Sequence, residues 1–176
     1  MIRSFNGKTP EIHESAFVSE AAYVVGDVEI GENSSVWPGA VIRGDWGKIK
    51  IGRNSAVEDN CVIHTGSYTA ISGVADLVIG DNVILGHGAV LNCRKIGNNV
   101  LIGMNCTVLP DVEIGDFCII AAGCLVSQGM KIPDRSFVAG FPAKIMGEAT
   151  EQQLKWTQYG PQTYADLAKQ YKEQGL

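Results

Sequence analysis

An aliphatic residue recurs every six positions along most of the chain. Twenty such positions can be marked once three breaks in the frame are allowed, and every one holds isoleucine, valine or leucine. The frame gains three residues after Ile42, gains ten after Ile63 and loses one after Leu91. The twenty aliphatic positions are Ile12, Val18, Val24, Ile30, Val36, Ile42, Ile51, Val57, Ile63, Ile79, Leu85, Leu91, Ile96, Ile102, Val108, Ile114, Ile120, Val126, Ile132 and Val138.

A period of six matches neither an α-helix nor a single strand. It fits a short strand followed by a tight turn, so that three units make one triangular coil with the aliphatic side chain inside. Twenty hexads make nearly seven coils, and at about 4.8 Å per coil the prism is roughly 30 Å tall. The pattern therefore predicts an all-β solenoid, a parallel β-helix.

The residue four places after each aliphatic position is mostly small, which suits the corner of a coil. These residues are Ala16, Ala22, Ser34, Ala40, Ser55, Cys61, Ala89, Cys106, Cys118 and Cys124. The four cysteines in this set are expected to pack inertly in the core. Cys93 does not occupy this position, so its role stays open.

The C-terminal segment carries helix signals. Phe141-Pro142-Ala143-Lys144 is expected to end the prism, and Thr150 with Gln153 forms a capping-box pattern. We expect one helix to about Tyr159, a break at Gly160-Pro161, and a second helix with an apolar face beyond it. The chain divides into a β-helix domain at 1–145 and a helical segment at 146–176 that packs on it.

Composition narrows the class of protein. The chain has 176 residues, is 45% hydrophobic and carries a net charge of −5 without a basic run, which argues against nucleic acid or an anionic membrane as a partner. No apolar run approaches the roughly 18 residues of a membrane span, and the N-terminus lacks the apolar core of a signal peptide. Five cysteines without a CxxC pair indicate reduced thiols. We therefore expect a cytoplasmic protein that acts on a small molecule.

The polar residues next to the aliphatic positions form columns. Arg43, His64 and Asn92 each follow an aliphatic position three hexads apart, so they stack on one wall. Asp59 and His87 stack in a second column on another wall. In a threefold homotrimer, the first column of one subunit would lie against the second column of the next. The hexad offset from Arg43 to Asp59 equals that from His64 to His87, so a pair of His64 and His87 between subunits implies a pair of Arg43 and Asp59 one coil below.

Two imidazoles held together across an interface suggest a metal, most simply zinc. The spacing alone makes this a weak signal, because single histidines are usually ordinary surface residues. His13 lies on a different wall and more than two coils away, and we expect it to be a surface residue.

The motifs resemble those of the γ-class carbonic anhydrase family, including its ferripyochelin-binding-protein-like relatives and those named for phenylacetate and carnitine pathways. The matching segments are 40–45, 58–64, 79–80 with 86–91, 103–104 and 139–144, and the likeness covers nearly the whole chain. The resemblance implies a left-handed β-helix, although the usual crossover rule predicts the opposite hand. It also implies a homotrimer with zinc or iron held at each interface by three histidines.

The resemblance assigns individual positions. His64 and His87 match two of the metal ligands, but the third position holds Asn92, and an amide oxygen is a poor zinc ligand beside imidazole. Cys93 is a conceivable substitute ligand, but adjacent strand residues point to opposite sides.

Further site positions follow from the same resemblance. Arg43 and Asp59 match an inter-subunit ion pair, and Asp45 matches the acidic residue after Arg-Gly. Glu58 occupies the place of a glutamine that orients metal-bound water. Tyr164 matches a tyrosine near the site, while its helical spacing equally predicts a helix-core residue. The acidic proton-shuttle loop of the most active members has no counterpart in 65–76.

Three functions remain open at this point. The first is reversible hydration of carbon dioxide by metal-bound hydroxide, weakened by Asn92, with acyl-CoA thioester hydrolysis as a variant. The second is a hexapeptide-repeat acyltransferase with His87 as general base. The third is a non-catalytic trimeric scaffold.

Overall fold

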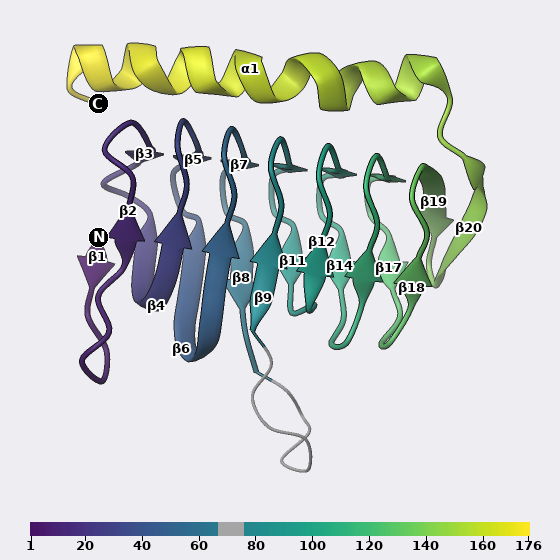
Figure 1. Cartoon of the computed structure of the whole chain (residues 1–176), viewed down its shortest axis with the longest axis horizontal. Helices are drawn as coiled ribbons and strands as arrows, with labels where there is room; N and C mark the ends of the chain where they lie inside the picture. The colour runs from purple at the N-terminus through teal and green to yellow at the C-terminus, as the bar shows by residue number, and fades with distance from the viewer. Residues whose placement is uncertain (67–75) are drawn as a thin grey trace.

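The computed structural model describes residues 1–66 and 76–176. Figure 1 shows a stack of coils with one long helix lying across it. The coils have three walls, and the strands of each wall pair in parallel with those above and below. The predicted all-β solenoid with a C-terminal helical segment is therefore confirmed. None of the described helices has the length and apolarity to cross a membrane.

We name the walls by what their outer side presents. The helix wall consists of β3 (Phe17–Val18), β5 (Ser35–Val36), β7 (Ala56–Val57), β10 (Ile84–Leu85), β13 (Leu101–Ile102), β16 (Ile119–Ile120) and β19 (Ser136–Gly140), closed by the antiparallel β20 (Ala143–Glu148). The apolar wall consists of β1 (Ile2–Arg3), the first parts of β4 (Tyr23–Ile30) and β6 (Val41–Ile51), β8 (Val62–His64), β11 (Val90–Leu91), β14 (Thr107–Val108) and β17 (Leu125–Val126). The charged wall consists of β2 (Glu11–Ile12), the last parts of β4 and β6, β9 (Leu77–Ile79), β12 (Lys95–Ile96), β15 (Glu113–Ile114) and β18 (Lys131–Ile132).

The aliphatic positions fill the inside of the coils, as predicted. Ile12 and Val18, in the first coil, are partly buried against the core, and the other eighteen positions are buried. The predicted corner cysteines Cys61, Cys106 and Cys118 are buried too, and burial raises the pKa of each thiol. Burying this much aliphatic surface is the main force that holds the stack together.

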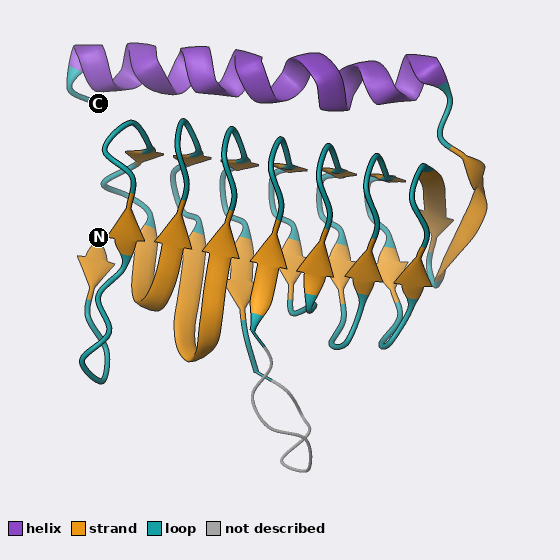
Figure 2. Ribbon diagram, viewed as in Figure 1, coloured by secondary structure: helices purple, strands orange, loops and turns teal. Residues whose placement is uncertain are grey.

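Two of the three corners are regular turns (Figure 2), and in nearly every coil each has one residue in the left-handed backbone conformation, with positive φ. Between the helix wall and the apolar wall these residues are Gly39, Asn60, Gly88, Asn105 and Gly123. Between the charged wall and the helix wall they are Asn33, Asn54, Asn82, Asn99, Phe117 and Arg135. Asparagine suits this corner because it tolerates positive φ and its amide bonds to the next coil. Asn54 donates to Asn82 Oδ1 at 3.4 Å, and Asn82 donates to Asn99 Oδ1 at 3.2 Å.

The third corner, between the apolar and charged walls, carries the breaks in the repeat. β4 and β6 run through it as continuous strands, seen as two broad bent ribbons at the lower edge in Figure 1. Thr65 ties the β6 turn to the next coil, because its hydroxyl accepts from the backbone of Gly47 and donates to the carbonyl of the same residue, each at 3.0 Å. This corner is therefore the one that departs from a plain structural repeat.

The C-terminal segment forms one helix, not two. α1 (Glu151–Gln174) begins with the predicted capping box and continues through Gly160 and Pro161. Gly160 lies so close to the helix wall that a Cβ there would meet Ile84 Cδ1 at 2.4 Å. Pro161 is buried against the wall together with Leu154, Thr157 and Ala168. This packing outweighs the hydrogen bond that the proline cannot make, so the predicted break is wrong.

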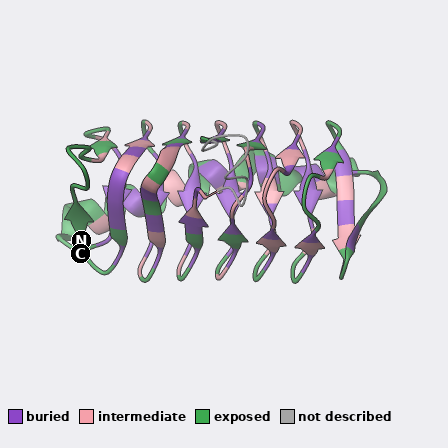
Figure 3. Ribbon diagram, turned by 90° about the horizontal axis from the view of Figure 1, so that it is seen from below, coloured by how far each residue is buried: buried purple, intermediate pink, exposed green. Residues whose placement is uncertain are grey.

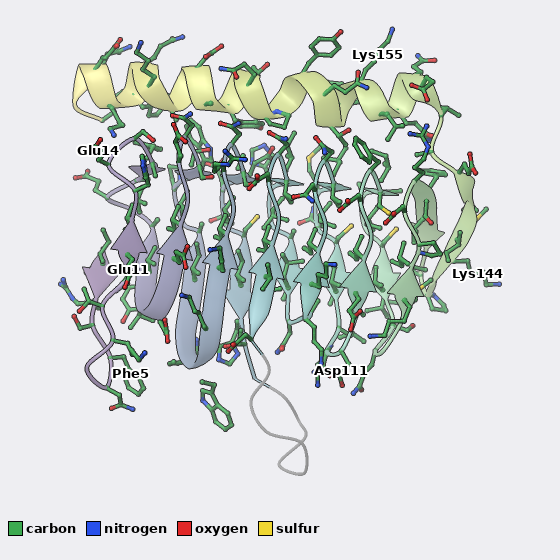
Figure 4. The ribbon with its side chains drawn as sticks, viewed as in Figure 1. Phe5, Glu11, Glu14, Asp111, Lys144 and Lys155 are labelled. Atoms are coloured by element: carbon green, nitrogen blue, oxygen red, sulfur yellow. The ribbon has the colours of Figure 1, made fainter. Side chains whose placement is uncertain are left out.

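α1 ties the two ends of the stack together. Its 24 residues give a length of about 36 Å, close to that of the coils it covers. At its start, Ala149 donates to the carbonyl of Arg135 at 2.7 Å. Near its end, Lys172 donates to the carbonyls of Glu14 and Ala16 at 2.7 and 3.2 Å. Figure 4 shows side chains filling the space between α1 and the coils.

Candidate functional site

The three walls differ in what covers their outward-facing residues. α1 covers the helix wall. The charged wall carries ion pairs between adjacent coils, such as Glu29 with Lys50 and Glu113 with Lys131. The apolar wall presents a column of Tyr23, Val41, Val62, Val90, Thr107 and Leu125 in register, of which Tyr23, Val62 and Val90 are exposed. Figure 3 views the stack from the side away from α1, where exposed positions alternate with buried ones along the strands.

One edge of the apolar wall carries the first predicted column. Arg43 and His64 are partners in the β6–β8 register, and Asn92 follows the β8–β11 pair of Ile63 and Leu91. His64 Nε2 lies 3.0 Å from Arg43 Nη2 and 3.0 Å from Asp45 Oδ1. The column is therefore where the sequence predicts it, and Asp45 joins it from the third corner.

The second column, expected on another wall, lies at the corner between the helix wall and the apolar wall, and so borders the opposite edge of the apolar wall. His87 lies at the corner that leads from β10 to β11, and its side chain is 49% exposed. Its Nδ1 is 3.0 Å from Asp59 Oδ2, and its Nε2 is 3.0 Å from Glu58 Oε2. Glu58 is buried and also accepts a hydrogen bond from the backbone of His87 at 2.9 Å.

Tyr164 reaches this second column from α1. Its ring packs against Trp37 with centroids 5.8 Å apart, so it belongs to the contact between helix and wall. Burial, together with the nearby carboxylate of Glu58, raises the pKa of Tyr164 above its usual value of 10.0. The two roles that the sequence leaves open for Tyr164 are therefore compatible.

His64 and His87 belong to opposite edges of one wall, and the single chain does not bring them into one site. Among residues 1–66 and 76–176, no three histidine, cysteine, aspartate or glutamate side chains are grouped so that they could hold a metal. The segment 65–76, in which the sequence shows no counterpart of the acidic proton-shuttle loop, lies outside the described residues at 67–75. His13 is an exposed residue that contacts Ser15, as expected of a surface histidine.

Cys93 does not replace the missing third histidine. Its side chain is in the core, and burial raises the pKa of the thiol to about 12. A neutral, inward-facing thiol is not a metal ligand. Asn92, between the buried residues Leu91 and Cys93, is partly exposed on the outer side of the coil.

Two contacts near the third corner were not foreseen from the sequence. One is the tie between Thr65 and Gly47 that positions the turn bearing Asp45. The other is an ion pair in which Arg94 Nε donates to Asp111 Oδ1 at 2.7 Å, one coil beyond. Asp111 is labelled at the lower edge of the coils in Figure 4. The sequence feature that could have indicated both contacts is that each involves a residue next to a break in the six-residue repeat.

Comparisons with known proteins agree with this fold. A family model described as "Bacterial transferase hexapeptide (six repeats)" matches residues 9–44 and 95–128. Gamma carbonic anhydrase 2, mitochondrial, of Arabidopsis thaliana is 37% identical over 162 residues, which are 92% of this chain and 58% of that protein. The carnitine operon protein CaiE of Salmonella agona (strain SL483) is 33% identical over 165 residues, 94% of this chain and 80% of CaiE.

A solved structure is also similar over the full length. The hexapeptide transferase family protein from Anaplasma phagocytophilum superposes with a TM-score of 0.89 at 34% identity, over 97% of this chain and 98% of that one. Fold and repeats thus define a left-handed parallel β-helix of the hexapeptide class. The chain belongs to the hexapeptide-repeat family, in the group that contains the γ-carbonic anhydrases and CaiE.

Proposed function

We propose that the protein is a homotrimeric enzyme of the γ-carbonic anhydrase type, with one water-activating site at each subunit interface. The observation that carries this proposal is the apolar wall, which bears exposed apolar side chains along its middle and one polar column at each edge. When three such walls face a threefold axis, the His64 edge of each subunit meets the His87 edge of the next. Val62 and Val90, which are 36% and 42% exposed, then become buried between subunits.

The register of the two columns supports this assembly. Pairing His64 with His87 of the partner subunit pairs Arg43 with Asp59 of the partner subunit, one coil below. In the single chain, Arg43 contacts His64, and Asp59 contacts His87. An Arg43–Asp59 ion pair between subunits would replace both contacts and leave His87 Nδ1 free to face the neighbouring subunit, while His64 Nε2 keeps its contact with Asp45.

The donors that meet in this way do not fit a catalytic zinc site. Such sites take three strong protein ligands and keep one open position. Here two imidazoles are joined by the Asn92 amide, whose oxygen is a weak ligand for zinc. No step of the proposed reaction is therefore routed through a metal.

The side chains around His87 are suited to activate water directly. Glu58 accepts the Nε2–H of His87 and fixes the ring, so that Nδ1 becomes the proton acceptor once Asp59 pairs with Arg43. Tyr164 of α1 lies near Glu58, whose carboxylate helps to raise the pKa of the phenol. Water deprotonated at Nδ1 can attack a carbonyl carbon, and carbon dioxide is the substrate suggested by the relatives named γ-carbonic anhydrases.

Acyl transfer is the second candidate. The arrangement that favours it is the exposed His87 imidazole backed by the buried carboxylate of Glu58, which is a general-base pair. The description of the matching family model and the Anaplasma phagocytophilum structure both name transferases.

The test is to purify the protein without a histidine tag, measure its mass in solution, and follow carbon dioxide hydration with chelator and with added zinc. The expected result is a trimer with weak hydration that survives the chelator. Asn92→His should raise zinc affinity and zinc-dependent hydration. A monomer, or a trimer without any hydration, would contradict the proposal, and acetyl transfer to an amine without hydration would favour the second candidate.

A further inference from the structure

Two residues at the candidate site depart from the family pattern together. Asn92 stands where the resemblance predicts a histidine, and Glu58 stands where it predicts a glutamine. They lie at opposite edges of the apolar wall, so the trimer brings Asn92 of one subunit toward Glu58 and His87 of the next. A single chemistry should account for both changes.

Glu58 changes what His87 can do. Its carboxylate is 6% exposed, and one of its oxygens, Oε2, accepts from the backbone of His87 at 2.9 Å and lies 3.0 Å from the ring Nε2. A glutamine could accept at this place with its single oxygen, but it lacks the negative charge that stabilises a protonated imidazole. Once Asp59 pairs with Arg43 of the adjacent subunit, the Glu58 carboxylate favours the proton of His87 on Nε2, and its charge makes Nδ1 a stronger base.

Asn92 changes what the other edge can offer. Its partly exposed side chain follows Leu91 and stacks one coil beyond His64. An amide is a poor metal ligand, but it carries two N–H donors. A neutral donor opposite a general base stabilises negative charge on a carbonyl oxygen during attack.

Resting on the trimer of the proposed function, we infer that the site hydrolyses acyl esters and thioesters without a metal, with Asn92 as the oxyanion donor. The proton of the attacking water passes to Nδ1 of His87 while the water oxygen bonds to the acyl carbon. The carbonyl electron pair moves onto its oxygen, which accepts a hydrogen bond from Asn92 of the adjacent subunit. When the oxygen re-forms its double bond, the thiolate leaves and takes the proton from His87, which yields a carboxylic acid and a thiol.

The experiment measures hydrolysis of p-nitrophenyl acetate and of acetyl-CoA by the trimer in the presence of a chelator. Asn92→Asp keeps the shape of the side chain but removes the N–H donors. We expect it to lower kcat by about 10²- to 10³-fold, with little change in KM. Asn33→Asp is the matched control: Asn33 is an exposed asparagine at the corner between the charged wall and the helix wall, away from both polar columns, and aspartate tolerates its positive φ.

A double variant provides the reciprocal test. Asn92→His with Glu58→Gln restores both residues of the family pattern, and we expect it to bind zinc and lose the chelator-resistant hydrolysis. Unchanged kcat in Asn92→Asp, or complete loss of wild-type hydrolysis with chelator, would overturn this inference. If the trimer forms and hydrates carbon dioxide but Asn92→Asp hydrolyses at the wild-type rate, only this inference fails. If no trimer forms, the proposed function fails with it.

Discussion

A mixed-subunit experiment tests whether the two histidines act across an interface. His64→Ala and His87→Ala each remove one of the two imidazoles, so trimers of either variant alone should lose most of their activity. In a mixed trimer, an interface is complete when its His64 comes from a His87→Ala subunit and its His87 from a His64→Ala subunit.

The magnitude follows from the placement of the two columns on opposite edges of one wall. In an equal mixture each requirement is met about half the time, so about a quarter of the interfaces are complete. We therefore expect the mixture to recover about a quarter of the wild-type activity per subunit. A site contained within one chain would recover none.

The assay needs differently tagged variants, co-expressed or mixed after reversible dissociation, with tags removed and trimers confirmed by mass. Carbon dioxide hydration and ester hydrolysis are then measured on the same sample. His13→Ala mixed with wild type is the control, since His13 is an exposed residue paired with Ser15. Mixed trimers that assemble but stay as inactive as the parents would refute the interface geometry.

Three further predictions test the wall, the corner and the helix contact. Val90→Glu should convert the trimer to monomers in a mass measurement, whereas Val78→Glu, equally exposed but on the charged wall between two lysines, should leave it intact. Asn82→Ala should lower the free energy of unfolding in urea by about 2 to 3 kcal/mol, because alanine is disfavoured at positive φ and cannot make the hydrogen bonds of the asparagine amide. Asn82→Gly should lower it by only about 1 kcal/mol, because glycine tolerates positive φ and loses only the hydrogen bonds. Since the pKa of Tyr164 is raised in the folded protein, stability should fall as the pH rises above about 10, and Tyr164→Phe should flatten that part of the unfolding curve.

The solenoid could be predicted because its signal is repeated. Each coil buries three aliphatic side chains, and a single misassigned residue does not change a period found twenty times. The handedness came from the resemblance alone, because the six-residue period fits either hand. The columns followed from the same period, since parallel pairing without slippage puts equivalent hexad positions side by side.

The helix was mispredicted for a physical reason. Gly160-Pro161 is a strong local break signal, but the glycine lets α1 approach Ile84 closely and the proline is buried against the helix wall. Tertiary packing outweighs local helix propensity when a helix lies along a wall for its whole length. The contacts of individual site residues could not be predicted from the sequence either. Arg43 has a predicted partner on another subunit, but in the single chain it contacts His64.

The hexapeptide repeat separates the residues that make the fold from those that make the site. Leu91 and Cys93 point into the core and are almost fully buried, while Asn92 between them faces outward. A change of residue at position 92 therefore alters the chemistry of the interface at little cost to the coil. The same holds for His64, which follows the buried Ile63, and for His87, which is an exposed residue of a corner turn. Variants at these positions should fold and assemble, so a loss of activity in them reports on the site.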